Sequence, residues 1–106
     1  MIEQSKAPID LAPDCVEKYK QLSMKSSREY RDLPKLRYII FKFSDSFSEI
    51  SVDIVGEEAL GKSPQAEYEA FLTTFTSPNL PRLAVYDMPY TTQSGMSHSA
   101  PIILHL

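Results

Sequence analysis

The apolar positions near the start of the chain indicate an amphipathic helix. Cys15, Tyr19 and Leu22 follow one another at intervals of four and three residues, and Val16 adjoins them. This spacing places the side chains on one face of an α-helix, which we expect to face the core. Asp14 suits the first turn of this helix, because the helix dipole favours an anion there.

Two segments in the middle of the chain follow the pattern of β-strands. Residues 36–43 are aromatic and β-branched with almost no polar interruption, which is typical of a central strand covered on both faces. Residues 49–55 alternate apolar and polar side chains, which indicates a half-buried strand. Residues 44–46 favour a turn between them, so we expect a hairpin. Residues 56–62 are interpreted as a loop.

A second helix is predicted to begin at Ser63 and Pro64. Serine offers a hydroxyl cap, and proline suits the first helical position. Tyr68, Phe71 and Leu72 are then expected to face inward.

The last part of the chain predicts a second hairpin. Residues 82–86 indicate a strand, residues 91–100 a polar loop and residues 102–106 a final strand. The order helix, hairpin, helix, hairpin predicts an α/β (α+β) domain, in which helices pack on a mixed, mainly antiparallel sheet.

Composition narrows the class of protein. The 106 residues suffice for one domain at most, and 42% apolar and 24% charged residues are ordinary for a globular protein. One cysteine leaves no internal disulfide and fits a reducing compartment. No apolar run reaches the ~20 residues of a membrane helix. We therefore expect a cytoplasmic protein without a transmembrane segment.

Charge is unevenly distributed in this chain of net charge −3. Residues 15–44 contain eight of the eleven basic residues and three acidic ones. Such a stretch favours an acidic partner, either an acidic protein surface or phosphoinositide headgroups, and it equally fits a solvated helix face. Nucleic acid is disfavoured as a partner, because no binding motif accompanies the basic residues.

Residues capable of catalysis or metal binding are sparse. Cys15 lies on the apolar helix face and is interpreted as a core residue rather than a reactive thiol. His98 and His105 have no third ligand near them in the sequence, so we predict no metal site and no cofactor. No pattern of an active site is present, and we predict a protein that is not an enzyme.

Four blocks of sequence resemble the ADF/cofilin family. They are IDLAPDCV at residues 9–16, YIIFK at residues 38–42, YEAFL at residues 68–72 and LAVYD at residues 83–87. The last block, followed by Tyr90, is the most specific. The resemblance rests on the order and spacing of the blocks and extends from Ile9 to Leu106.

The resemblance implies an actin-binding protein that promotes depolymerisation, severing and turnover of actin filaments. It implies an actin-depolymerising-factor homology fold, a monomeric protein and a place in the actin cytoskeleton. The family's long helix, last strand and last helix would follow Leu106. We therefore expect residues 1–106 to form a single partial domain that lacks its C-terminal helix–strand–helix part.

In the family, the N-terminal segment contacts actin, and here we expect residues 1–8 to be flexible. The matching contact residues are Ser5, Lys6, Ala7, Pro8 and Ile9. Many family members carry a regulatory serine in this segment, whose phosphorylation adds charge and disfavours actin binding. Ser5 is the candidate phosphorylation site, although alignment through Asp14 and Cys15 places the family's serine nearer Ala7.

Of the family's two other actin contacts, one is the long helix that would follow Leu106, and the other lies just before the last strand predicted here. Where the family usually has basic residues, this chain has His98 and Ser99, which we treat as candidate filament-side contacts. With Pro101 after them, this stretch also resembles glia maturation factor, a relative that acts on the Arp2/3 complex. The alternatives are therefore a regulator of the Arp2/3 complex or a truncated fold fragment with little independent activity.

The connector at residues 25–35 is longer than the family's usual link between first helix and first strand. It contains Ser26, Ser27 and several basic residues. This connector is either an added contact loop or phosphorylation site, or a tolerated surface insertion.

Overall fold

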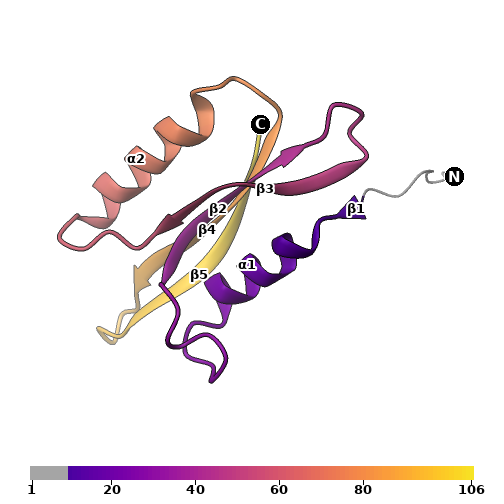
Figure 1. Cartoon of the computed structure of the whole chain (residues 1–106). Coiled ribbons are helices and arrows are strands. Elements are labelled where there is room, and N and C mark those ends of the chain that lie inside the picture. The colour runs from indigo at the N-terminus through magenta and orange to yellow at the C-terminus, as the bar shows by residue number, and fades with distance from the viewer. Residues whose placement is uncertain (1–9) are drawn as a thin grey trace, which may run out of the picture.

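The computed structural model describes residues 10–106 and contains a five-stranded sheet with a helix on each face (Figure 1). The elements are β1 (Asp10–Leu11), α1 (Pro13–Ser23), β2 (Leu36–Phe43), β3 (Glu49–Glu57), α2 (Pro64–Thr76), β4 (Arg82–Thr91) and β5 (Ser97–His105). The strand order is β1-β3-β2-β4-β5, and every pairing is antiparallel except that of β1 with β3. The predicted fold, helices on a mixed and mainly antiparallel sheet, is confirmed.

Both helices begin where the sequence predicts. The Ser63 hydroxyl accepts a hydrogen bond from the Ala66 N–H at 3.1 Å, and Pro64 occupies the first helical position of α2. α1 begins at Pro13 without a side-chain cap, and Asp14 supplies the acidic residue of its first turn. Proline contributes to both starts because its fixed φ suits a helix and its missing N–H would have had no partner there.

The core has two layers, one on each face of β2. Ile39 and Ile40 are both fully buried, and as neighbours on a strand they point to opposite faces. Ile40 packs with Phe71 and Phe75 of α2, whereas Ile39 packs with Leu22 of α1. β2 is therefore the central strand covered on both faces that its apolar run predicts.

The inward face predicted for α2 is present. Phe71 is buried, and Tyr68 and Leu72 are partly buried against the same cluster. Tyr68 and Phe71 also surround the ring of Tyr86 on β4, at centroid distances of 4.9 and 4.8 Å. This layer of aromatic rings fixes α2 on the sheet.

β3 is longer than predicted, because Gly56 and Glu57 belong to the strand rather than to a loop. The ring of Tyr38 on β2 lies directly over Gly56. A Cβ atom added to Gly56 would be 2.0 Å from Cε2 of Tyr38. The missing side chain thus makes room for Tyr38 to pack on Phe71, with ring centroids 4.8 Å apart.

The second hairpin is also longer than predicted. β4 continues to Thr91 and β5 begins at Ser97, so residues 97–100, predicted as loop, are in a strand. The loop is confined to residues 92–96, closed by a 2.9 Å bond from the Thr92 N–H to the Met96 carbonyl, with Gly95 at φ 86°. The outer part of this hairpin is exposed, so its polar side chains give no apolar alternation to reveal the strand.

The apolar face predicted for α1 is only partly buried. Cys15 and Leu22 are buried, but Val16 and Tyr19 are 45% and 42% exposed. They border an open groove of about 400 Å³ whose other side is formed by Leu83 on β4 and Ile103 on β5, with further apolar residues between. The residues that the structure describes therefore leave part of this face of the sheet uncovered.

Candidate functional site

The candidate N-terminal contacts and the candidate phosphorylation site, Ser5, Lys6, Ala7, Pro8 and Ile9, lie outside the described residues. The structure shows where the chain that carries them joins the sheet. The Asp10 N–H donates to the Ser48 carbonyl and the Ala12 N–H to the Ile50 carbonyl, both at 2.9 Å. These bonds place β1 beside β3, immediately after the β2–β3 hairpin turn. This two-residue strand was not predicted, because so short an element has no detectable period.

The candidate filament-side residues His98 and Ser99 are neighbours on β5 but face opposite sides of the hairpin. His98 stacks on exposed Tyr90, with ring centroids 5.6 Å apart. The Ser99 hydroxyl donates to Oδ2 of Asp87 at 3.2 Å. Successive side chains of a strand point to opposite faces, so the structure does not bring His98 and Ser99 together on one surface.

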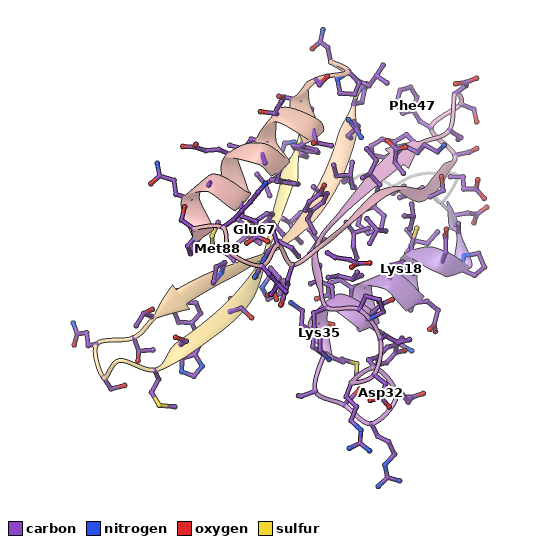
Figure 2. All side chains as sticks on the ribbon, turned by 60° about the vertical axis from the view of Figure 1, so that its left-hand side comes forward. Lys18, Asp32, Lys35, Phe47, Glu67 and Met88 are labelled. Atoms are coloured by element: carbon purple, nitrogen blue, oxygen red, sulfur yellow. The ribbon has the colours of Figure 1, made fainter. Side chains whose placement is uncertain are left out.

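A cluster of charged side chains connects the α1–β2 connector to the sheet. Lys25 Nζ lies 2.6 Å from Oδ2 of Asp87 and 2.5 Å from Oε2 of Glu58. Arg37 Nε lies 3.2 Å from Oε2 of Glu67, and its Nη1 donates to the Asp87 carbonyl at 2.8 Å. Figure 2 shows Glu67 pointing from α2 toward the sheet. The cluster contains cations from the connector and β2 and carboxylates from β4, α2 and the loop after β3.

Sequence reasoning missed this cluster. Lys25 is separated by 33 residues from Glu58 and by 62 from Asp87, so no local spacing relates them. The signal that did exist was the charged residue Arg37 inside a strand predicted to be covered on both faces. A charge in such a position usually has a partner.

The cluster changes the interpretation of the basic stretch. Lys25 and Arg37 are engaged in ion pairs, and Lys35 Nζ donates to the carbonyls of Lys25 and Arg31 at 3.0 and 2.8 Å. Arg28 and the Arg31 side chain remain exposed on the connector. Part of the basic stretch therefore holds the connector in place, and part faces solvent.

Cys15 is a core residue, as predicted. Its thiol is 4% exposed and donates to the Ile50 carbonyl at 3.3 Å. Burial, followed by the negative charge of Asp14, raises the pKa of the Cys15 thiol. A thiol that stays protonated is a poor nucleophile, so this cysteine serves packing.

Two further features are absent from residues 10–106. No three His, Cys, Asp or Glu side chains in this range come together in a way that could hold a metal ion. No helix in this range is long and apolar enough to span a membrane.

The fold resembles three solved structures. Streptomyces griseoflavus cofilin is 26% identical, with a TM-score of 0.66, over 92% of this chain and 59% of that one. Plasmodium berghei actin depolymerization factor 2 is 18% identical, with a TM-score of 0.65, over 95% and 64% of the two chains. The ADF-like UNC-60A protein of Caenorhabditis elegans is 22% identical, with a TM-score of 0.57, over 93% and 63%. The last two, below 25% identity, show the fold alone.

These relatives are longer than the present chain, which spans 59% to 64% of their lengths. No curated protein matches the sequence. The sequence model of the family described as cofilin/tropomyosin-type actin-binding proteins matches residues 8–104, nearly the whole chain. This match agrees with the sheet order and with the helix on each face. The chain therefore belongs to the cofilin/ADF family of actin-binding proteins.

Proposed function

We propose that this chain binds actin and promotes the depolymerisation, severing and turnover of actin filaments. The observation that carries the proposal is the match to an actin-binding family over residues 8–104. The fold shared with Streptomyces griseoflavus cofilin supports it. On this proposal the domain acts as a monomer, in the cytoplasm, on actin monomers, filaments or both.

Two regions of the chain are proposed to contact actin. The first is the N-terminal segment with Ser5 to Ile9, which precedes β1 in the sequence. The second is the outer part of the β4–β5 hairpin, where His98 and Tyr90 form an exposed aromatic pair. Ser99 is a weaker candidate, because its hydroxyl is bonded to Asp87.

The proposal is tested with purified actin. Binding of the chain to fluorescently labelled monomers, and its co-sedimentation with filaments, should both be saturable. A cooperative unfolding transition measured first by circular dichroism would show that the tested chain is folded. A folded chain that shows no saturable binding to either form of actin would overturn the proposal.

Two variants separate the proposed regions. Removal of residues 1–9 should weaken monomer binding, whereas His98→Ala should weaken filament co-sedimentation more than monomer binding. Leu60→Ala is a suitable control, because Leu60 is 98% exposed and belongs to the loop after β3 rather than to either region. If all three changes affect actin binding equally, the two regions are not the actin contacts.

Ser5 is proposed as a regulatory phosphorylation site. Phosphorylation would add about −1.5 to −2 charges at pH 7. Ser5→Glu, which adds a negative charge, should therefore weaken actin binding more than Ser5→Ala does. Similar binding by both variants would exclude regulation at this residue.

Phosphoinositides are proposed as a second ligand class, supported by exposed Arg28 and Arg31 on the connector. Co-sedimentation with vesicles containing phosphatidylinositol bisphosphate should exceed that with neutral phosphatidylcholine vesicles, and it should fall with rising salt. Arg28→Gln combined with Arg31→Gln should abolish the difference. Retention of binding by this double variant would place the lipid site elsewhere.

A further inference from the structure

The turn between β2 and β3 is held by a dense set of hydrogen bonds. The Ser44 hydroxyl accepts bonds from the N–H groups of Ser48 and Glu49, both at 3.1 Å. The Ser44 carbonyl accepts a bond from the Phe47 N–H at 2.8 Å, and the hydroxyls of Ser46 and Ser48 lie 2.7 Å apart. The conformation of this turn is therefore strongly determined by its own residues.

The turn holds Phe47 in an unfavourable backbone conformation. Its φ of 57° lies in the left-handed region, which bulky residues rarely adopt. Phe47 is 55% exposed, and its ring lies 5.8 Å, centroid to centroid, from that of Phe43. Figure 2 shows Phe47 at the far end of the hairpin. Asparagine or glycine would suit the backbone better, so folding alone does not explain a phenylalanine here.

A groove of about 360 Å³ separates Phe47 from the loop between α2 and β4. On the far side lie Leu80, which is 58% exposed, and Pro81. Leu80 follows Asn79, which also has a positive φ, of 55°. Two turns with left-handed residues thus hold two exposed apolar side chains on opposite sides of one groove, with exposed Lys42 at its border.

One side of the groove is formed by the turn to which β1 is bonded. The Ser48 carbonyl, one residue beyond Phe47, accepts the hydrogen bond from the Asp10 N–H. A partner that contacts residues just before Asp10 would also lie beside the turn. The hairpin turn is therefore bonded to β1, the strand that directly follows in sequence the segment that the proposed function assigns to actin.

We propose that the groove between Phe47 and Leu80 is a further actin contact, which receives an apolar side chain of the actin monomer. This inference rests on the proposed function and extends its N-terminal contact onto the folded domain. Aromatic residues are enriched at the centres of protein interfaces, and a rigid turn limits the entropy lost on binding. Lys42 and Asp45 both line the groove, so its polar border has charges of both signs and its apolar part is the basis of the proposed contact.

The test compares Phe47→Asn with the unchanged chain. Asparagine tolerates a positive φ, so the melting temperature should stay the same or rise. Loss of an aromatic anchor should weaken monomer binding by about tenfold or more. Leu80→Ser should weaken binding in the same direction, and Leu60→Asn, in a loop elsewhere, should have no effect. A Phe47→Asn variant that is as stable as the unchanged chain or more stable, but binds actin more weakly, would show that Phe47 serves binding rather than folding.

The outcomes distinguish this inference from the proposed function. If the unchanged chain does not bind actin, the proposed function itself fails. If the unchanged chain and Phe47→Asn bind equally well, only the Phe47 contact is overturned. Sedimentation of the chain alone provides a further check. Self-association that disappears in Phe47→Asn would assign the groove to a second copy and would also overturn the actin contact.

Discussion

At the scale of single residues, Arg82 makes the most consequential contacts in the structure. Its side chain is 2% exposed, and Nη2 lies 2.7 Å from Oδ2 of Asp53 on β3. Nη1 donates to the carbonyls of Thr74 and Phe75 at 3.2 Å. These carbonyls are in the last turn of α2, where the helix supplies no donors of its own. One guanidinium thus connects β3, β4 and the end of α2.

We predict that Arg82→Met destabilises the domain by about 2–4 kcal/mol, because it leaves the helix carbonyls without donors and Asp53 without its partner. Denaturant unfolding measures the change. Arg31→Met is the control: the Arg31 side chain is exposed, and its replacement should change the free energy of unfolding by less than about 0.5 kcal/mol. Equal unfolding midpoints for the two variants would contradict this role of Arg82.

Tyr86 gives a pH-dependent prediction. Its buried hydroxyl has no hydrogen-bond partner among residues 10–106, and burial, followed by the charge of Glu67, raises the pKa of Tyr86 to about 12. In the unfolded chain tyrosine titrates near pH 10. Between about pH 10 and 12 the unfolded chain therefore loses a proton that the folded chain retains. Stability should fall as pH rises through this window, by up to about 1.4 kcal/mol per pH unit from this group.

Tyr86→Phe tests the cause of this loss. Below pH 10 the variant should be as stable as the unchanged chain or more stable, because the substitution removes a polar atom that has no partner. Above pH 10 its stability should fall less steeply. Urea unfolding at pH values from 9 to 12 gives the free energy of unfolding of both proteins. If it falls equally steeply with pH in both, groups other than Tyr86 cause the loss of stability at alkaline pH.

At the scale of elements, the α1–β2 connector is ordered by Lys25 rather than by a helix or strand. Asp87, one of its two carboxylate partners, has a side chain only 6% exposed. We predict that Lys25→Met costs about 2–3 kcal/mol, because a buried carboxylate loses its cation. Amide hydrogen exchange in residues 24–35 should accelerate more than exchange in α2. Lys20→Met, at an exposed position of α1, is the control.

The sequence predicts the existence and order of the longer elements well because their apolar spacing is regular. Ser63 and Pro64 locate the start of α2 to the residue, since capping chemistry is local. Strand ends are less predictable. Gly56 belongs to β3 because Tyr38 of β2 covers it, and this contact depends on the tertiary structure. Residues 97–100 belong to β5 because they pair with β4, which polar side chains do not reveal.

At the scale of the whole molecule, the candidate site is less predictable than the fold. The family resemblance indicates His98 and Ser99 as candidate contacts, but it does not indicate that they face opposite sides of the β4–β5 hairpin. Sequence reasoning did not single out Phe47, because a phenylalanine after a turn carries no mark of its positive φ. The ion pairs of Lys25 escaped for a similar reason, since they depend on the approach of distant segments.

The two faces of the sheet are also covered unequally, and this asymmetry gives the last prediction. α2 closes its face with buried aromatic rings, whereas α1 leaves an apolar groove beside Leu83 and Ile103. The folded chain should therefore increase the fluorescence of an anilinonaphthalene sulfonate dye without denaturant, because such dyes report exposed apolar surface.

Ile103→Asp should reduce this dye signal, because Ile103 is 75% exposed and borders the groove. Its unfolding midpoint should change little, since the side chain is mostly outside the core. Leu60→Asp is the matched control, because Leu60 is 98% exposed but does not line the groove. Equal loss of signal in both variants would place the dye elsewhere, and a folded chain that binds no dye would show that the groove is closed in solution. A groove that does bind the dye would mark this face of the sheet as surface available for a further protein segment.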